Sequence, residues 1–294
     1  MPVAIVTGGY GFVGRRVVEA LGQAGWEAIA AGRPDQEIPS RAFDDLLEQV
    51  SPQLVVHAAG PASVPASIED PHADLLGSVV VLSALLDRVV HLPTPPRVLL
   101  VSSAAVYGQP QRLPVDEGAA VAPVSPYGQH RAMAERLLLD RAASAGLRVT
   151  IARVFSAYGE GLRRQLLWDV CRRAADPPIH LSGTGEETRD FLHVDDVARA
   201  LAAIAERAPF DGGVYNVGSG RATTVATVAR ALVEALGGRP GDVVFDGTVR
   251  EGDPRAWQAD VTRLAALGFA PTVTIADGLA RYAAWAGAEL HVAP

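Results

Sequence analysis

The segment SPYGQHRAMAE, residues 125–135, places a tyrosine and an arginine where they could share the work of proton transfer. Its Ser-Pro start and the helix formers that follow predict a helix over about 126–145, with Tyr127 and Arg131 four residues apart on one face. A phenol ordinarily loses its proton only at about pH 10. A tyrosine that acts as an acid/base near neutral pH therefore needs a cation beside it. Arg131 supplies the charge but, unlike a lysine, keeps its own proton and cannot relay one.

A glycine-rich turn near the start of the chain indicates a second chemistry, the binding of a pyrophosphate. TGGYGFVG carries Gly8, Gly11 and Gly14, with Phe12 and Val13 inside the motif, between a predicted strand and an amphipathic helix. Such a turn brings the backbone close to a phosphate and presents amide donors at a helix N-terminus. The sequence therefore predicts a dinucleotide site.

The end of the second predicted strand, AAGRPD, bears on which dinucleotide is bound. NAD enzymes usually have a carboxylate there for the adenosine ribose, whereas Arg33 suits the 2′-phosphate of NADP. Asp35 leaves NAD open, and an Arg33 that is merely solvated is a further alternative. We predict NADP, with NAD possible.

The elements around these motifs indicate an α/β fold. Short β-branched runs alternate with helical patterns in the first half of the chain, which is typical of βαβ units and a Rossmann-type doubly wound parallel sheet. The predicted strands include 97–108 and 148–159. We expect a dinucleotide-binding domain over 1–155 and a smaller C-terminal α/β substrate-binding domain over 156–294, partly interleaved with the first.

The second half has a different rhythm, with helices separated by short strands and polar loops. A helix is predicted over 161–175, and another over 193–208 with its cap at Asp195 or Asp196. Cys171 is expected to be half-buried on the first of these helices and not to act as a nucleophile.

Eight motifs follow one another in a fixed order: TGGYGFVG, VVHAAG, VSSAAVYG, SPYG…R, RVFSAYGEG, GTGEETRDFLHVDDVA, VYNVGSG and REGD. In this order they resemble the extended short-chain dehydrogenase/reductases, a superfamily of nucleotide-sugar epimerases, dehydratases and ketoreductases. The resemblance extends from about Val3 to Trp285, and it is specific for the superfamily but not for the substrate.

The resemblance implies roles for residues on the cofactor side. Tyr127 takes the place of the family's acid/base, and Ser103 that of the residue that hydrogen-bonds the reacting sugar oxygen. Arg131 takes the place of the lysine that stabilises phenolate and holds the nicotinamide ribose. The VVHAAG motif adds three cofactor-binding residues, namely Ala58, Ala59 and Gly60.

The resemblance also narrows the reaction. Dehydratases of this superfamily carry Asp-Glu directly after the position of Ser103, for proton transfer at the sugar. Ala104 and Ala105 stand there and cannot transfer protons. Sugar 4,6-dehydration by that route is therefore not expected.

On the substrate side, the resemblance implies an arginine clamp for a diphosphate. Arg189 and Arg250 match the clamp, and Asp253 is expected to orient Arg250 or to touch a ribose. Ser156 stands where relatives often have an asparagine that contacts the diphosphate or the sugar, and it is expected on the substrate side. Arg164, with its neighbours Arg163 and Gln165, either lines the pocket or starts a solvated helix.

Two further positions differ from the family pattern. Asp74 stands where relatives have an asparagine that supports the catalytic region. His130, where the family often has a serine, lies three residues after Tyr127 and could approach the site, but we expect a surface histidine.

Composition sets limits on function. A net charge of −7 argues against nucleic-acid binding as the main task. The most apolar stretch is too short and too often interrupted by charge to cross a membrane, and the first residues lack the features of a signal peptide. A single cysteine suits a reducing cytoplasm, and no metal site is predicted.

The chain contains no lysine, so all 26 basic residues are arginine. Arg131 therefore fits a general replacement of lysine better than a loss of activity. We predict an NAD(P)-dependent nucleotide-sugar epimerase or 4-ketoreductase whose partner is a nucleotide-diphosphate sugar. The alternative is a non-catalytic binder with a degenerate Tyr-x-x-x-Arg site. The resemblance also implies a homodimer through helices at about 73–90 and 126–145.

Overall fold

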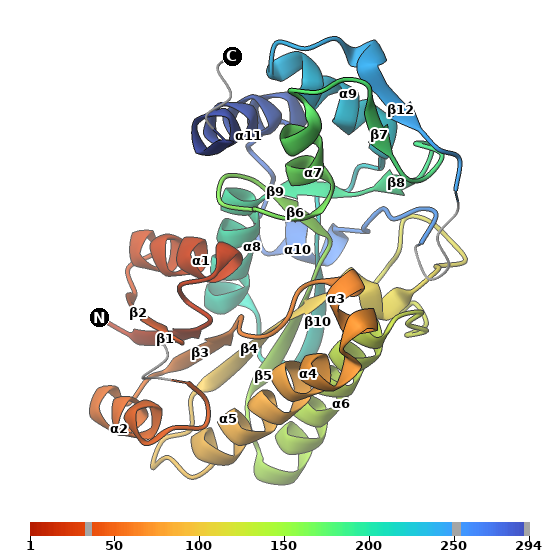
Figure 1. Ribbon diagram of the computed structural model, residues 1–294. Helices are drawn as coiled ribbons and strands as arrows, with labels where there is room; N and C mark the ends of the chain where they lie inside the picture. The colour runs from red at the N-terminus through yellow and green to blue at the C-terminus, as the bar shows by residue number, and fades with distance from the viewer. Residues whose placement is uncertain (33–36, 249–253, 291–294) are drawn as a thin grey trace.

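The computed structural model describes residues 1–32, 37–248 and 254–290. Six parallel strands form its central sheet in the order β10-β5-β4-β3-β1-β2 (Figure 1). This order confirms the predicted doubly wound sheet, because it reverses between β1 and β3. The strands are β1 (Val3–Thr7), β2 (Glu27–Ala31), β3 (Leu54–His57), β4 (Arg97–Ser103), β5 (Val149–Val154) and β10 (Asp211–Val217).

Helices cover both faces of the sheet, and successive side chains along a strand point alternately to the two helical layers. Ala4 and Val6 face the layer made by α1 (Phe12–Gln23) and α8 (Val194–Arg207). Ile5 faces the opposite layer. That layer is made by α2 (Arg41–Val50), α5 (Val81–Val89) and α6 (Pro126–Ala145). The β strands are therefore nearly continuous apolar runs, as parallel strands buried on two faces require.

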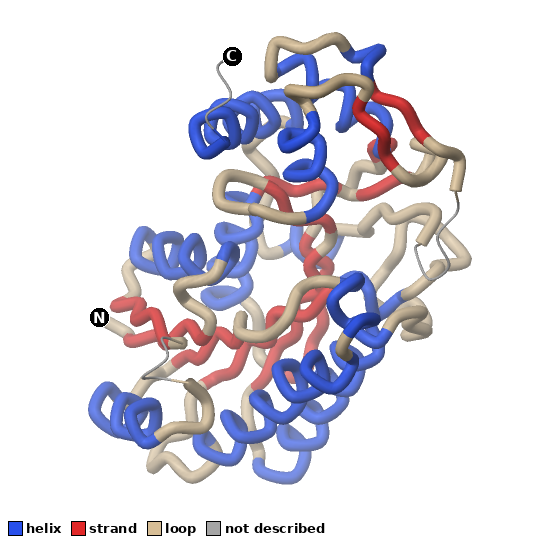
Figure 2. The backbone as a smooth tube through the Cα atoms, viewed as in Figure 1, coloured by secondary structure: helices blue, strands red, loops and turns tan. Residues whose placement is uncertain are grey.

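Residues 71–89 form one helical run with a π turn inside it. Its parts are α4 (Pro71–Leu75), η2 (Leu76–Val80) and α5, and α3 (Val64–Glu69) precedes them. Gly77 lies in the π turn, and a side chain there would come within 2.7 Å of Pro61 Cδ. The run can therefore pass close to the loop after β3, which lies between the sheet and the second lobe (Figure 2).

The second lobe packs three helices on small sheets. The helices are α7 (Gln165–Arg173), α9 (Val225–Ala235) and α11 (Ile275–Leu290), and they share one apolar core. The strand pairs are β6 (Ser156–Tyr158) with β9 (Phe191–His193), β7 (Ile179–Leu181) with β12 (Val243–Phe245), and β8 (Thr188–Arg189) with β11 (Thr223–Thr224). Short helices η3 (Ala104–Tyr107), η4 (Pro240–Asp242) and α10 (Thr262–Ala266) complete the fold.

The chain enters the second lobe after β5 and then returns. Strand β10 pairs in parallel with β5 at the edge of the first sheet, with Val217 opposite Val154. Helix α8, which precedes β10, packs directly on α1, and both helices cover the same face of this sheet. The two lobes are thus interleaved in the chain.

Several local predictions were wrong. The strand predicted over 97–108 ends at Ser103 and turns into η3. Helix α8 is capped by His193, whose Nδ1 accepts a hydrogen bond from the Asp195 amide, and not by either aspartate. The helix predicted from residue 161 begins at Gln165. Cys171 is buried rather than half-buried. No helix within the described ranges is long and apolar enough to span a membrane.

Candidate active site

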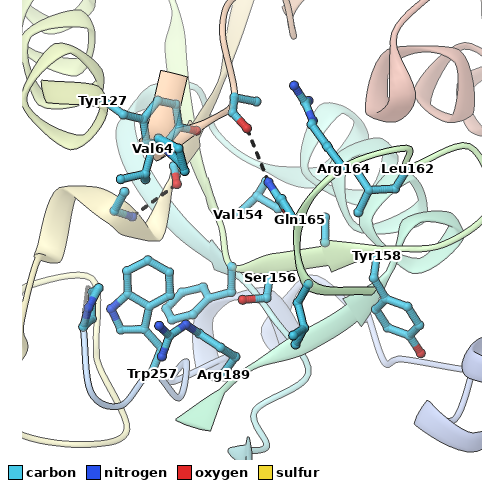
Figure 3. Close-up of a pocket in the computed structure, with 18 of the residues that line it drawn as sticks. Val64, Tyr127, Val154, Ser156, Tyr158, Leu162, Arg164, Gln165, Arg189 and Trp257 are labelled. Carbon is cyan, nitrogen blue, oxygen red and sulfur yellow. Dashed lines mark hydrogen bonds between the residues drawn. The ribbon is translucent and has the colours of Figure 1, made fainter. Parts of the chain in front are cut away.

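A cleft of about 1180 Å³ lies between the carboxyl ends of the sheet strands and the second lobe. Figure 3 shows Tyr127 and Val64 on one wall, with Ser156, Arg189 and Trp257 across from them. The predicted residues that line the cleft are Gly8, Gly11, Phe12, Val13, Gly14, Ala58, Gly60, Ser103, Tyr127, Arg131, Ser156, Arg164 and Arg189. Ala59 does not line it. Arg33, Arg250 and Asp253 lie outside the described residues.

The glycine turn at the start of the cleft is held by close backbone contacts. Gly8 has a φ of +68°, and its carbonyl accepts a hydrogen bond of 2.9 Å from the Gly11 amide. A Cβ on Gly14 would come within 2.1 Å of the Gly8 oxygen, so this position requires glycine. Gly11 caps α1 without a side-chain hydrogen bond. The first amides of α1 are therefore open to an anion, and the turn fits a dinucleotide pyrophosphate.

Ala59 and His57 support this turn from behind. A Cβ on Gly8 would come within 2.8 Å of the Ala59 backbone, so the two segments are in direct contact. His57 Nδ1 lies 2.7 Å from Thr7 Oγ1, which joins the ends of β3 and β1. Burial, together with the positive charge of Arg131, lowers the pKa of His57 to about 3. The imidazole is therefore neutral at ordinary pH.

Helix α6 places Tyr127 at the cleft through its first turn. Ser125 caps the helix by accepting a hydrogen bond of 3.2 Å from the Gly128 amide. The Tyr127 amide donates to Ser67 Oγ at 3.1 Å. A side chain on Gly128 would come within 2.6 Å of the Ala105 carbonyl, so glycine lets α6 approach η3 closely. Tyr127 and Ser103 consequently line the same cleft.

Arg131 lies beside Tyr127, as the i, i+4 spacing predicts. Its Cζ is 5.3 Å from the centre of the Tyr127 ring, and only 5% of its surface is exposed. The guanidinium donates to the carbonyls of Pro61 and Val101, at 2.5 Å and 3.4 Å. Arg131 is therefore a fixed cation held by backbone oxygens of the loop after β3 and of β4.

Ser103 ends β4 with its hydroxyl at the start of η3. Its Oγ accepts a hydrogen bond of 3.2 Å from the Ala105 amide and retains a donor for another group. Ala104 and Ala105 are both buried, and neither carries a group that could move a proton.

His130 is not the surface residue that the sequence predicted. It is 9% exposed, and its Nδ1 lies 2.7 Å from Oδ2 of the buried Asp74. The prediction was wrong because the helical run over 71–89 covers this face of α6. Asp74, in place of the family's asparagine, thus pairs with the histidine that replaces the family's serine.

A buried network fixes α6 against strands β4 and β5 of the sheet. The Glu135 carboxylate accepts hydrogen bonds from Ser102 Oγ and from Arg153, the shortest to Arg153 at 2.7 Å. The Arg153 guanidinium stacks on the Tyr107 ring at 4.7 Å. The Glu135 charge raises the pKa of Arg153 above its usual value despite the opposing effect of burial.

The outer half of the cleft carries arginines and an aromatic wall. The Arg189 guanidinium lies 5.4 Å from the ring centre of Trp257, whose Nε1 donates to the Gly108 carbonyl. Ser156 lines the cleft beside them, and Arg164 lines it from the loop before α7. Arg163 instead turns away and pairs with Glu289 at 2.7 Å.

Sequence reasoning missed Trp257. The signal available was a tryptophan four residues after the REGD motif, in an otherwise polar stretch. The buried Asp190 beside Arg189 was also missed. It accepts hydrogen bonds from Ser219, Gly220 and Ala259, and so ties the loops behind the outer half together. No cluster of residues suited to a metal ion occurs in the parts of the chain that the structure describes.

A dinucleotide turn, a tyrosine with a cation at the next helical turn and an arginine-lined outer half meet in this one cleft. Fold and site together define an extended short-chain dehydrogenase/reductase. The chain belongs to the NAD dependent epimerase/dehydratase family, whose family model matches residues 4–218.

Relatives and solved structures span nearly the whole chain. It is 31% identical to a UDP-glucose 4-epimerase of Azospirillum brasilense, over 96% of this chain and 91% of that protein. It is also 31% identical to a dTDP-glucose 4,6-dehydratase of Streptomyces griseus, over 96% of this chain and 93% of that one. The structure of MoeE5 with UDP-glucuronic acid and NAD superposes with a TM-score of 0.87 at 31% identity, covering 97% of this chain and 99% of MoeE5.

Proposed function

We propose that the protein is an NAD(P)-dependent nucleotide-sugar 4-epimerase, with 4-ketoreduction as the second candidate. The observation that carries the proposal is that Tyr127, Ser103 and the fixed Arg131 line the same cleft as the dinucleotide turn. A bound dinucleotide would supply reversible hydride transfer to and from a sugar carbon.

The protein's own residues would move the proton and hold the reacting oxygen. Tyr127 takes the proton of the sugar hydroxyl as that carbon is oxidised and returns it on reduction. Arg131 holds a fixed positive charge 5.3 Å from the centre of the Tyr127 ring while the proton moves. Ser103 donates its free hydroxyl proton to the reacting oxygen.

The anchoring of Arg131 favours epimerisation over ketoreduction. An epimerase returns the same proton to the sugar, so Tyr127 needs no fresh proton from solvent. A reductase spends one proton per turnover and must resupply Tyr127. Arg131 keeps its proton and is tied to the Pro61 and Val101 carbonyls, so it cannot take part in that supply.

Dehydration is not proposed, although a dehydratase is among the relatives. That reaction needs proton transfer at neighbouring sugar carbons. The residues after Ser103 are the apolar Ala104 and Ala105, which offer no acid or base.

Arginines in the outer half of the cleft support a nucleotide-diphosphate sugar as substrate. Arg189 and Arg164 both line it, and a planar guanidinium can pair with phosphate oxygens through two parallel hydrogen bonds. MoeE5 binds UDP-glucuronic acid in one solved structure and UDP-glucose in another. We therefore propose a UDP-sugar as the first substrate to test.

Arg33 supports NADP as the preferred cofactor, on the sequence argument alone. MoeE5 binds NAD, whereas RMD from Pseudomonas aeruginosa, 26% identical to this chain, binds NADPH. The dissociation constants of NAD and NADP, measured on the wild type and on Arg33→Asp, decide this point. Equal affinities for NADP in the two proteins would contradict a role for Arg33.

Conversion of UDP-glucose and UDP-glucuronic acid, followed by chromatography of the products, tests the main proposal. We expect interconversion of C4 epimers without net consumption of NADPH, and a loss of at least a hundredfold in Tyr127→Phe. The variant should still bind the dinucleotide. Stoichiometric consumption of NADPH by a 4-keto sugar would establish the reductase instead. Turnover that survives in Tyr127→Phe would show that the base is misassigned, and binding without turnover would favour the non-catalytic alternative.

We also propose a homodimer that pairs α6 and the helical run over 71–89 with their counterparts. Support comes from large apolar side chains that these helices expose, namely Leu76, Val80 and Met133. Light scattering of the wild type and of Met133→Glu tests this. A monomeric wild type would refute it.

A further inference from the structure

Gln165 holds a backbone conformation that its side chain makes unfavourable. It has a φ of +67° at the first residue of α7. Two other residues of the same loop, Gly159 and Gly161, also have positive φ, and there the chain uses glycine. Residues with a β-carbon disfavour this region of φ. A glutamine rather than a glycine at position 165 therefore points to a need for its side-chain amide.

The amide of Gln165 reaches across the cleft. Its Nε2 donates to the Ala62 carbonyl at 3.4 Å, and both residues line the cleft. Figure 3 shows the Gln165 side chain pointing into the cleft. Ala62 directly follows Pro61, whose carbonyl accepts from Arg131. The loop after β3 therefore accepts hydrogen bonds from two side chains, from Arg131 beside Tyr127 and from Gln165.

The loop that carries Gln165 is anchored without this bond. Arg15 of α1 donates to the Glu160 carbonyl at 2.6 Å. The Glu160 side chain contacts His193 at 3.0 Å and Arg281 at 2.8 Å. These contacts fix the loop to α1, to the end of β9 and to α11. The loop therefore does not need the side-chain amide of Gln165 to hold its place, and this amide is free to act in the cleft.

We propose that Gln165 is a positioning residue that bridges the cleft and retains the oxidised sugar. This inference rests on the proposed epimerase function. During epimerisation Tyr127 would take the hydroxyl proton while a bound dinucleotide would accept the hydride from the same sugar carbon, which leaves a ketone on the sugar. The ketone must remain, and present its other face, until hydride and proton return. A bridge from α7 to Ala62 closes the mouth of the cleft during that interval.

Two variants separate the effect of the hydrogen bond from Gln165 to Ala62 from the effect of the backbone strain at residue 165. Gln165→Glu keeps the length and the β-carbon but has no donor for the Ala62 carbonyl. Gln165→Asn is one methylene too short to reach it, and asparagine tolerates positive φ better than glutamine. Ser51→Gly is the control, because Ser51 has a φ of +44° at the end of α2, away from the cleft.

The assay follows absorbance of reduced nicotinamide while each protein turns over the UDP-sugar that the wild type epimerises. If the ketone escapes, the enzyme is left with a reduced dinucleotide and no ketone to reduce. We expect both Gln165 variants to accumulate this dead-end state about threefold to tenfold faster than the wild type, the effect of losing one hydrogen bond. Gln165→Asn and Ser51→Gly should unfold at the same urea concentration as the wild type or a higher one. Ser51→Gly should retain the ketone normally.

Each other outcome overturns the inference in an identifiable way. Equal retention in wild type, Gln165→Glu and Gln165→Asn would refute the bridge while leaving the epimerase intact. A lower urea midpoint in Gln165→Asn would show that the side chain serves the fold. A wild type that produces neither epimer nor reduced nicotinamide would remove the proposed function itself, and the bridge with it.

Discussion

Replacing Gly14 by alanine tests the dinucleotide turn without knowledge of the substrate. The added methyl group would come within 2.1 Å of the Gly8 oxygen and 2.9 Å of Gly9 Cα. Both neighbours are backbone atoms, so no side chain can rotate out of the way. The turn and α1 must move apart by about 1 Å to reach ordinary contact distance.

The cost can be worked out from this geometry. Forcing a methyl group into a packed site costs about 1–3 kcal/mol. Movement of Gly8 also breaks its 2.9 Å hydrogen bond with Gly11, which adds about 1 kcal/mol. Gly14→Ala should therefore lower the free energy of unfolding by about 2–4 kcal/mol. The displaced amides should weaken dinucleotide binding by about tenfold or more.

Gly22→Ala on the same helix is the matched control. A Cβ there meets no atom within 4 Å. Alanine is also the better helix former, so this variant should gain about 0.5–1 kcal/mol and bind the dinucleotide normally. Urea unfolding and calorimetric titration with NAD and NADP give both quantities. If Gly14→Ala unfolds within about 0.5 kcal/mol of the wild type and binds equally well, the close contact has been misjudged.

Three further predictions concern buried groups. Glu135→Ala should lower the free energy of unfolding by about 3–5 kcal/mol, because it leaves the charge of Arg153 without its carboxylate partner. The double variant Glu135→Leu with Arg153→Met should restore most of this stability. A double variant no more stable than Glu135→Ala would contradict the prediction. The folded pKa of His57, about 3, lies below its ordinary 6.5, so the unfolded chain binds the extra proton between these values and stability is lost as pH falls through this window. Urea titrations from pH 6 to 4 should show a wild-type loss steeper than that of His57→Asn by about 1.4 kcal/mol per pH unit, and parallel curves would refute the assignment. Burial raises the pKa of Cys171 to about 12, so a disulfide reagent should label this thiol only in denaturant, and fast labelling of the native protein would contradict its burial.

Local signals predicted the elements that carry their own start and stop residues. Helix α6 forms from Pro126 to Ala145 because Ser125 caps it and Gly146, in the left-handed region, ends it. The glycine turn lies between β1 and α1 because only glycine fits at Gly14. In such places the sequence alone contains the steric reason for the structure.

Features that depend on distant segments could not be predicted. His130 is buried because the helical run over 71–89 packs on α6, and no pattern near residue 130 indicates this. The two carbonyls that hold Arg131 come from the loop after β3 and from β4, 70 and 30 residues away in the chain. The spacing of Tyr127 and Arg131 predicts their shared face but not where the guanidinium is tied.

The return of β10 to the first sheet determines how the two lobes can be exchanged by recombination. A fragment that stops at residue 155 would lose β10 from the sheet edge and α8 from the face that α1 shares, so it would expose an unpaired strand and an apolar layer. A single crossover therefore cannot give this scaffold a different second lobe. A working chimera needs two grafted segments, 156–210 and 218–290, with residues 211–217 kept from the recipient. The first graft must preserve the α8 surface that packs on α1, and the second must preserve the α10 side chains that complete the same core.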